Sequence, residues 1–372
     1  MPTLNLIIAD RDQLYLDNLV DFISLKYKNR FYVQSFSNEK TFAEYIERVE
    51  KVDILLICPQ FYREDLQLKK IESLMVLSSG VVPEDIKDYV IINKYQTGDK
   101  LISNILNIFS EVSNHRVFTE DANNPCKVIT FFSPCGGSGK STLAIGTSVC
   151  CVQDNINAFY LNLERFPSTT LYFDSHGNNE NFSSIMFYLK ENNKNLPLKI
   201  EGCRSIDRTT GVHYFLPQEN IFDIDDMTAE EVKSLIMQLK KMACYDTIVI
   251  DIGSELNDIN VSVLEHSDLI ILVLPDDMIL AHRFGSFLKG LEILKKRRGI
   301  NLIEKSELVI NKCSDPSFLD RDDTVLSGKS IFSRIPTIKG LGIDFGMEYF
   351  TNPQTPMGSS IKQIVHKLKQ LI

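Results

Sequence analysis

A glycine-rich loop occupies residues 134–142, which read Pro-Cys-Gly-Gly-Ser-Gly-Lys-Ser-Thr. It follows the apolar run Val128–Phe132 and precedes Leu143–Val149, a small-residue stretch with the composition of a buried helix. A strand, a glycine turn, Lys-Ser/Thr and a helix in this order form the arrangement that binds nucleoside triphosphates. The glycines let backbone N–H groups close around phosphate oxygens, and the helix directs its positive end at the same anion. The loop departs from the usual pattern G-x-x-x-x-G-K-[ST] at its first glycine, which is Pro134 here.

Each part of this loop has an expected role at such a site. The glycine turn would cradle the phosphates, Lys140 would reach the outer phosphates, and the Ser141 hydroxyl would complete the shell of a Mg²⁺ ion. ATP and Mg²⁺ are therefore the expected cofactors. The cofactor-binding residues predicted in the loop are Gly136, Gly137, Ser138, Gly139, Lys140, Ser141 and Thr142.

Polar residues also end three other apolar strands, at the sheet edge where doubly wound folds bind their ligands. Asp251 would hold the Mg²⁺ hydration shell through water, Glu164 ends a second strand, and Asn311 ends a third, where its amide could pair with an adenine edge. Lys140, Glu164 and Asp251 are the predicted catalytic residues, and Ser141 and Asp251 form the predicted metal site. A strand-end Asp is also common as a helix cap, and such an Asn as a turn residue, so both simpler interpretations stay open.

Two blocks of apolar strands alternate with helical segments on either side of a polar, turn-rich stretch. A chain of 372 residues is long enough for two domains with cores of their own. Strands alternating with helices predict parallel sheets covered on both faces. We therefore predict an α/β protein with two doubly wound parallel-sheet domains, residues 1–112 and 126–372, joined by a linker at 113–125. The expected strands are 4–8, 31–36, 53–58, 74–77 and 89–92, then 128–132, 158–163, 212–215, 247–250, 269–274 and 308–310.

The second domain resembles the MinD/ParA group of P-loop ATPases. That group has the loop K-G-G-x-G-K-[ST], an acidic switch after the second strand, a strand of the form Y-D-x-[IV]-[IV]-[IV]-D, and a late N-[KR]. The corresponding segments here are residues 135–141, 162–164, 245–251 and 311–312. The resemblance covers most of residues 126–372, and it implies that ATP and Mg²⁺ bind in a sandwich homodimer with the two sites face to face.

Cys135 is the main departure from this group. The group has a lysine here that crosses the dimer to the other subunit's phosphates, and a thiol cannot supply that charge. The switch position is Glu164, one methylene longer than the group's Asp. Because phosphoryl transfer depends on where charge is placed at the transition state, we expect ATP binding with slow or partner-dependent hydrolysis. The alternative is that Cys135 is a small filler in a loop that another lysine serves.

The first domain resembles a response-regulator receiver, a flavodoxin-like fold. The matching positions are Asp10 and Asp12 after the first strand, Ser78 or Ser79 after the fourth, and Lys94 after the fifth. Cys58 stands where a receiver has its phosphoacceptor Asp, and a thiol cannot form an aspartyl phosphate. The resemblance therefore implies an atypical receiver used as a docking or dimerising module.

A receiver-like domain followed by such an ATPase is similar to the TadZ/CpaE family of pilus-assembly localisation factors. That resemblance implies a cytoplasmic protein concentrated at a cell pole, with the Tad pilus or secretion machinery or a polar landmark as its partner. The alternatives are a ParA-type DNA-partitioning ATPase and a signalling protein whose receiver gates ATP hydrolysis. The net charge of −9 argues against strong nucleic-acid binding, and Cys58 argues against phosphorylation-dependent signalling.

Other segments give weaker expectations. No apolar run approaches the ~20 residues of a membrane span, so membrane contact is expected to be at most peripheral. Lys295–Arg298 could touch DNA or anionic lipid, but a solvated helix end is the simpler expectation. Ser359–Ile372 should be a helix packed on the sheet of the second domain, with a membrane-targeting helix as the alternative. The polar stretch Asp174–Thr210 should be a surface excursion, part of a dimer or partner face. The eight scattered cysteines predict reduced thiols.

Overall fold

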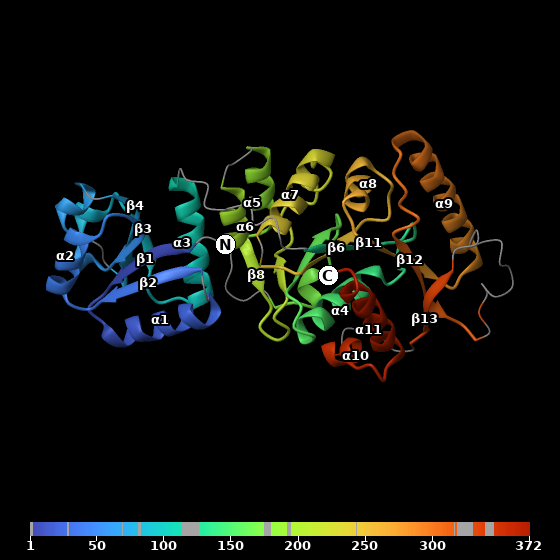
Figure 1. Ribbon diagram of the computed structural model, residues 1–372, viewed down its shortest axis with the longest axis horizontal. Coiled ribbons are helices and arrows are strands. Elements are labelled where there is room, and N and C mark those ends of the chain that lie inside the picture. The colour runs from blue at the N-terminus through green and yellow to red at the C-terminus, as the bar shows by residue number, and fades with distance from the viewer. Residues whose placement is uncertain are drawn as a thin grey trace. The chain divides into compact units, whose positions relative to one another are not determined.

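The computed structural model describes residues 3–27, 30–68, 70–80, 83–113, 126–174, 180–191, 195–242, 244–315, 317, 330–338 and 346–372. The chain forms two compact units (Figure 1). The amino-terminal unit is Met1–Glu120 with Gly177–Glu180 and Asn192–Cys203, and the carboxy-terminal unit is Asp121–His176 with Asn181–Glu191 and Arg204–Ile372. Of the predicted linker, residues 114–125 lie outside the described residues.

The amino-terminal unit is built on a parallel five-stranded sheet in the order β2-β1-β3-β4-β5. Its strands are β1 (Leu4–Ala9), β2 (Phe31–Phe36), β3 (Val52–Ile57), β4 (Ile71–Ser78) and β5 (Val90–Asn93), and its longer helices are α1 (Gln13–Lys26), α2 (Glu39–Arg48) and α3 (Gly98–Val112). Helices α1 and α3 share one apolar cluster with the sheet, and α2 packs in a second. This strand order is that of flavodoxin-like doubly wound folds, which confirms the predicted fold class.

The connections on both sides of β4 hold only short 3₁₀-helices in their described residues: η1 (Pro59–Phe61), η2 (Glu64–Leu68) and η3 (Glu84–Ile86). The sequence predicted a sheet covered by helices on both faces, and this cover is thinner than expected. Proline opens η1 and immediately precedes η3. Proline suits a first helical turn but lacks the N–H group that the interior of a longer helix requires.

Helix α6 (Leu196–Cys203) belongs to the amino-terminal unit, although the segments before and after Asn192–Cys203 belong to the carboxy-terminal unit. It packs on α3, and Leu198 is fully buried in the cluster that α1 and α3 share. The sequence had placed this segment in the domain 126–372, within the polar surface excursion 174–210. The structure differs because the polar residues of α6 find buried partners that are distant in sequence.

Charged side chains fix α6 to its neighbours. Nε of Arg30 donates to the two carboxylate oxygens of Glu201 at 3.0 and 2.9 Å, and both side chains are buried. Nζ of Lys199 donates to the carbonyl of Asn107 at 3.1 Å and to Glu111 at 2.8 Å. Burying an unpaired charge is strongly unfavourable, so these pairs make α6 a specific part of the amino-terminal unit.

The carboxy-terminal unit is built on an eight-stranded sheet in the order β13-β12-β11-β6-β10-β7-β9-β8. Its strands are β6 (Lys127–Phe132), β7 (Ala158–Leu163), β8 (Arg204–Ile206), β9 (His213–Phe215), β10 (Thr247–Ile252), β11 (Leu269–Pro275), β12 (Ser306–Cys313) and β13 (Ile331–Pro336). All neighbours are parallel except β8, which runs antiparallel to β9. The predicted doubly wound fold is confirmed; the edge strands β8 and β13 were not predicted, because β8 is short and both begin in polar surroundings.

Helices cover both faces of this sheet (Figure 1). Helices α5 (Phe182–Lys190), α7 (Ala229–Lys241), α8 (Asp258–Glu265) and α9 (Met278–Arg298) lie on one face, and α4 (Lys140–Gln153), α10 (Met347–Thr351) and α11 (Pro356–Lys369) on the other. At the start of α7, Thr228 and Glu231 satisfy each other's backbone N–H groups in a capping box, as predicted. Among the described helices, none combines the length and the hydropathy needed to cross a bilayer.

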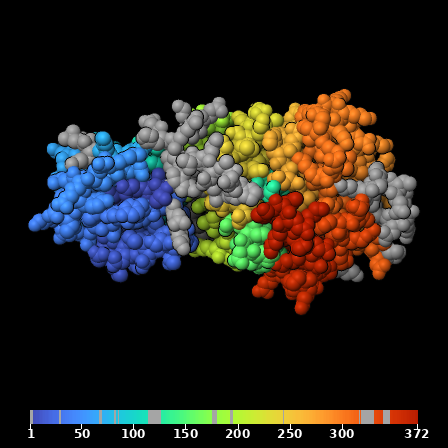
Figure 2. Space-filling model, viewed as in Figure 1, coloured from blue at the N-terminus to red at the C-terminus, as the bar shows by residue number. Residues whose placement is uncertain are grey.

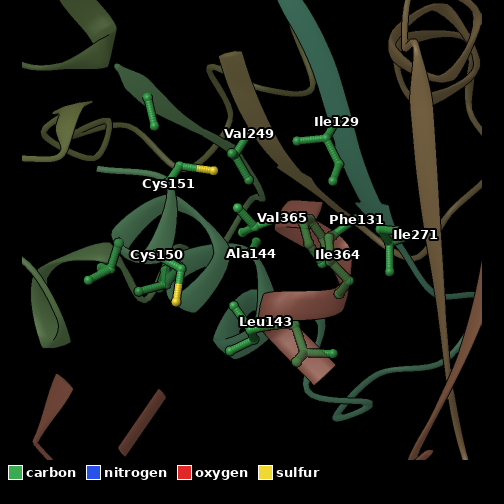
Figure 3. Packing of buried hydrophobic residues seen from close by; sticks show 14 of the residues in the cluster. Ile129, Phe131, Leu143, Ala144, Cys150, Cys151, Val249, Ile271, Ile364 and Val365 are labelled. Carbon is green, nitrogen blue, oxygen red and sulfur yellow. The ribbon is translucent and has the colours of Figure 1, made fainter. Parts of the chain in front are cut away.

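The closing helix α11 packs against α4 and the sheet, as the sequence predicted. Leu143 and Ala144 of α4 share one buried cluster with Ile364 and Val365 of α11 and with Val249 of β10 (Figure 3). In the space-filling view the surfaces of α4 (green) and α11 (red) adjoin (Figure 2). Because α4 directly follows the glycine-rich loop, this packing fixes the position at which the loop ends.

Candidate nucleotide-binding site

The glycine-rich loop joins β6 to α4 through two residues in the left-handed backbone region. Gly137 has φ 67° and Gly139 has φ 90°, values that L side chains rarely adopt. A Cβ on Gly139 would also lie 2.3 Å from the amide nitrogen of Asn311, whereas nothing lies within 4 Å of a Cβ added to Gly136 or Gly137. The loop thus leaves open space beside the start of α4, whose first N–H groups have no acceptor within the helix.

A pocket of about 630 Å³ opens beside this loop, a volume typical of small-ligand sites. It is lined by every predicted cofactor-binding residue, Gly136–Thr142 and Asn311, and by Glu164. The structure therefore brings the predicted loop residues and two of the strand-end residues to one place. Lining residues that the sequence did not predict include Ser168, Tyr172, Ser254 and Lys312.

The three predicted catalytic residues meet at the start of α4. Nζ of Lys140 forms an ion pair with Glu164 and lies 3.5 Å from Oδ1 of Asp251. The hydroxyl of Ser141 donates to Oε2 of Glu164 at 3.2 Å. Ser141 also lies close enough to the Asp251 carboxylate to lower the pKa of that group. The two residues predicted to hold a metal are therefore neighbours.

Asp251 is fully buried behind the loop, where the hydroxyl of Tyr160 donates to its Oδ2 at 3.2 Å. Burial raises the pKa of Asp251 to about 6, and the charge of Lys140 opposes that rise. Burial also raises the pKa of Tyr160 well above its usual value, so the phenol stays protonated. Asn162 Nδ2 donates to the Tyr160 oxygen at 3.1 Å. Tyr160 was not among the residues predicted from the sequence. Its available signal is the i, i+2 spacing from Asn162, which puts both side chains on one face of β7.

Asn311 lines the pocket but holds the loop. Its Nδ2 donates to the carbonyl of Ser138 at 2.8 Å, and its Oδ1 accepts from the N–H of Lys312 at 2.9 Å. The amide predicted to pair with an adenine edge therefore has both of its atoms engaged within the protein. Nζ of Lys312 donates to the carbonyl of Gly137 at 2.8 Å, so a second lysine does lie at the loop, as the alternative interpretation of Cys135 requires.

Cys135 is buried beside the loop glycines and does not line the pocket. Its side chain is 2% exposed, and its N–H donates to Oγ of Ser133 at 3.2 Å. Burial raises the pKa of the Cys135 thiol, and the charge of Arg283 offsets part of that rise. The thiol is therefore uncharged at neutral pH and buried with the residues that pack against the loop.

The oxygen atoms of the site fit a nucleotide with Mg²⁺. Oδ1 of Asp251 and Oγ of Ser138 are buried and make no hydrogen bond with the described residues. Mg²⁺ prefers oxygen ligands and retained water, which the hydroxyl of Ser141 and the carboxylate of Asp251 can supply together. Within the described part of the chain, no group of three or more His, Cys, Asp or Glu side chains could hold a metal alone.

A second polar cluster lies at the carboxyl edge of the amino-terminal sheet. Nζ of Lys94 donates to Oδ1 of Asp10 at 2.9 Å and lies 3.5 Å from Oδ2 of Asp12. Cys58, directly after β3, is buried, and burial raises the pKa of its thiol. The structure thus brings Asp10, Asp12 and Lys94 together at the sheet edge where β3 ends just before Cys58. Ser78, at the end of β4, donates to the carbonyl of Gly80 within its own turn.

Solved structures match this chain, whereas no protein-family model and no curated protein matches its sequence. The ParA family ATPase of Chlorobium tepidum TLS aligns with a TM-score of 0.54 and 20% identity, over 67% of this chain and 100% of that chain. The chain contains a MinD/ParA-type ATPase fold. A proposed plasmid partition protein of Borrelia burgdorferi B31, bound to AMPPNP, aligns with a TM-score of 0.51 and 20% identity over 66% of this chain and 99% of that chain. The MinC:MinD cell division complex of Aquifex aeolicus aligns with a TM-score of 0.50 and 15% identity over 66% and 96%.

Three exposed apolar side chains follow strands of the carboxy-terminal sheet at its carboxyl edge. Phe166 follows β7, Leu256 follows β10, and Ile279 lies at the start of α9 after β11; their exposed fractions are 72%, 40% and 69%. Because β11, β6, β10 and β7 are neighbours in this order, these side chains lie along the edge that also carries the loop. Exposed apolar side chains gathered at one edge are typical of a surface that contacts another protein.

Proposed function

We propose that this protein is an ATP-binding, dimerising localisation or assembly factor of a Tad-type pilus or secretion apparatus. The observation that carries the proposal is the convergence of Lys140, Ser141 and Asp251 at a glycine loop beside an open pocket. The MinD/ParA-type fold supports nucleotide binding, because the Borrelia burgdorferi protein with this fold is bound to AMPPNP.

In the proposed complex, N–H groups of the loop and of the first turn of α4 bind phosphate oxygens, and Lys140 reaches the outer phosphates. The hydroxyl of Ser141 binds Mg²⁺, and Asp251 holds a water of its hydration shell. The ion neutralises phosphate charge. Asn311 keeps the loop in shape through the carbonyl of Ser138, so its role is to position the phosphate cradle.

We propose slow or partner-dependent ATP hydrolysis. Glu164 takes the switch position, and its carboxylate pairs with Lys140. Cys135 is neutral and buried, and Lys312 is held on a loop carbonyl. Because stabilisation of transition-state charge supplies most of the catalysis in phosphoryl transfer, a site with few free cations favours binding over turnover.

The exposed apolar edge supports a homodimer. A second copy laid across Phe166, Leu256 and Ile279 would remove these side chains from water and would cover the mouth of the pocket. Nucleotide bound there would become part of the subunit interface, so dimerisation should depend on ATP and Mg²⁺.

The amino-terminal unit supports the Tad-type proposal through the order of the two domains. Its cluster of Asp10, Asp12 and Lys94 lies at the sheet edge where β3 ends just before the buried Cys58, and a thiol cannot accept a phosphoryl group as an Asp does. We therefore propose an atypical receiver that docks on the Tad machinery or on a polar landmark. The protein would act in the cytoplasm at a cell pole.

A ParA-type partitioning ATPase is the second candidate, favoured by the fold match to the proposed plasmid partition protein. It requires DNA binding. The basic run Lys295–Arg298 is partly neutralised, since Arg298 lies 3.0 Å from Asp258 and 3.6 Å from Glu265. A net charge of −9 adds long-range repulsion from DNA, so this candidate is the weaker one.

Nucleotide binding is tested by titrating the full chain with a fluorescent ATP analogue, with and without Mg²⁺. The wild type should bind in a Mg²⁺-dependent way, and Lys140→Ala should weaken binding on the order of 100-fold, because it removes a charge-assisted contact in a partly buried site. Lys295→Ala, in the exposed basic run, is the control and should bind like the wild type. A wild-type chain that binds no analogue would refute the proposal.

Light scattering and localisation separate the two candidates. The Tad-type proposal expects a dimer with ATP and Mg²⁺, a polar focus of a fluorescent fusion, and no DNA binding at physiological salt. A fusion that follows the nucleoid, together with salt-sensitive DNA binding, would favour the partitioning ATPase instead.

A further inference from the structure

We propose that Glu164 is an internal competitor of the nucleotide: its carboxylate occupies the phosphate-binding lysine, and ATP binding displaces it. This inference rests on the proposed nucleotide site and adds to it a residue that sets its affinity. An acidic residue at the end of a strand can turn toward solvent or cap a helix. Glu164 instead contacts the side chains of Lys140 and Ser141, both of which are expected to bind the nucleotide and its metal ion.

Glu164 engages both side chains that a Mg²⁺–triphosphate would need. Lys140 pairs with one of its carboxylate oxygens, and the hydroxyl of Ser141 donates to the other at 3.2 Å. The side chains of Lys140 and Glu164 are only 8% and 19% exposed. Charges that are shielded from water interact more strongly than charges at an open surface, so the carboxylate is a strong occupant of this position.

The backbone of Glu164 is held in place around this contact. Its N–H donates to Oδ1 of Asn162 at 2.8 Å, and its carbonyl accepts from Nε2 of Gln218 at 3.1 Å. Asn162 is fixed in turn, since its Nδ2 donates to Tyr160 and, at 3.3 Å, to Thr169. With the backbone fixed, the length of the side chain decides whether the carboxylate reaches Lys140.

Phosphate oxygens and the Glu164 carboxylate compete for the same cation. A phosphate at Lys140 would lie beside a carboxylate of like charge, and Mg²⁺ on the Ser141 hydroxyl would take the donor that Glu164 now uses. Part of the binding free energy must therefore be used to break the contacts of Glu164, which weakens the observed affinity. Ser168 and Tyr172, which follow Glu164 in the chain, also line the pocket, so the displaced carboxylate would remain close to the bound nucleotide.

The test is a titration of full-length variants with a fluorescent ATP analogue and Mg²⁺. Glu164→Gln keeps the size and removes the charge, so we expect its Kd to fall by about tenfold, which corresponds to about 1.4 kcal/mol. Glu164→Asp keeps the charge on a shorter side chain and should show a smaller decrease. Glu255→Gln removes an exposed carboxylate at the same sheet edge and should leave Kd within about twofold, because solvent screens that charge. A Kd for Glu164→Gln equal to or above that of the wild type would overturn the inference.

A second measurement needs no nucleotide. In urea unfolding, Lys140→Met, Glu164→Gln and the double variant form a double-mutant cycle, which should show coupling because the two side chains are in contact. Independent effects of the two changes would overturn the inference, and circular dichroism verifies that each variant is folded. A wild type that binds no nucleotide refutes the proposed function, whereas a wild type and a Glu164→Gln variant that bind equally well refute only the competitor.

Discussion

The buried pair of Arg30 and Glu201 offers a direct test of the position of α6. The two side chains are 5% and 2% exposed, and Nη2 of Arg30 lies 2.8 Å from Oε2 of Glu201. Glu201→Gln would leave the guanidinium buried without a counter-charge. Removal of one partner from a buried ion pair destabilises by about 3–5 kcal/mol, which for a unit of this size corresponds to a fall of roughly 10 °C or more in its unfolding midpoint.

The assay is chemical and thermal unfolding of the full chain, followed by circular dichroism. Arg30→Met combined with Glu201→Gln should recover part of the loss, because no uncompensated charge then remains. Asp99→Asn is the control: Lys26 and Asp99 are 3.0 Å apart but 46% and 34% exposed, so losing this pair should change stability by less than about 1 kcal/mol. If Glu201→Gln were no more destabilising than Asp99→Asn, α6 would not be docked as described.

Four further predictions concern the nucleotide site and the polar cluster of the amino-terminal unit. Burial raises the pKa of Asp251 to about 6, above its usual value, so the folded state holds this proton more tightly than the unfolded chain does. The contribution of Asp251 to the free energy of unfolding should therefore decline as pH rises through 6. Unfolding measured from pH 4 to 8 should show a pH-dependent difference between the wild type and Asp251→Asn, and a constant difference would contradict the assignment. Mg²⁺-dependent nucleotide affinity should fall below pH 6 as the same carboxylate is protonated, which titrations across this range measure. Gly139→Ala, with φ 90° and a Cβ 2.3 Å from Asn311, should destabilise by about 1–3 kcal/mol and abolish nucleotide binding, whereas Gly136→Ala meets no atom within 4 Å and should leave stability unchanged. If the amino-terminal unit is the atypical receiver proposed above, a small phosphodonor should leave it without an aspartyl phosphate, because Cys58 would stand where a receiver has its acceptor Asp. An intact-mass increase of one phosphoryl group would contradict that proposal.

The sequence was sufficient to predict the structure wherever the geometry of a short segment depends only on its own residues. The loop before α4 was predictable because glycine spacing and Lys-Ser encode a turn that begins a helix. Asp251 and Glu164 could be placed at one edge because parallel strands of a doubly wound sheet end on the same side. The apolar strands were long enough to be recognised, since both faces of a buried parallel strand are apolar.

The parts that the sequence did not predict depend on partners distant along the chain. Arg30 and Glu201 lie 171 residues apart, and a helix as short and charged as α6 carries no local signal of burial. In the sequence, Tyr160 is indistinguishable from the other apolar residues of its strand, and its function depends on the hydrogen bond to Asp251, 91 residues further along the chain. The contacts of Asn311 and Glu164 also depend on which neighbours each side chain reaches, and local spacing does not specify that.

The position of α6 also bears on how such a chain can be rebuilt by recombination. The chain returns to the amino-terminal unit after the carboxy-terminal unit has begun, so no single cut separates the two. In a chimera that exchanged only the residues before 126, the foreign amino-terminal unit would lack the residues that contact α6. Lys199 and Glu201 would then lose Glu111 and Arg30, the side chains that balance their charges. A foreign amino-terminal unit should therefore be accepted only when residues 192–203 are transplanted with it, and the two stretches should be inherited as a pair.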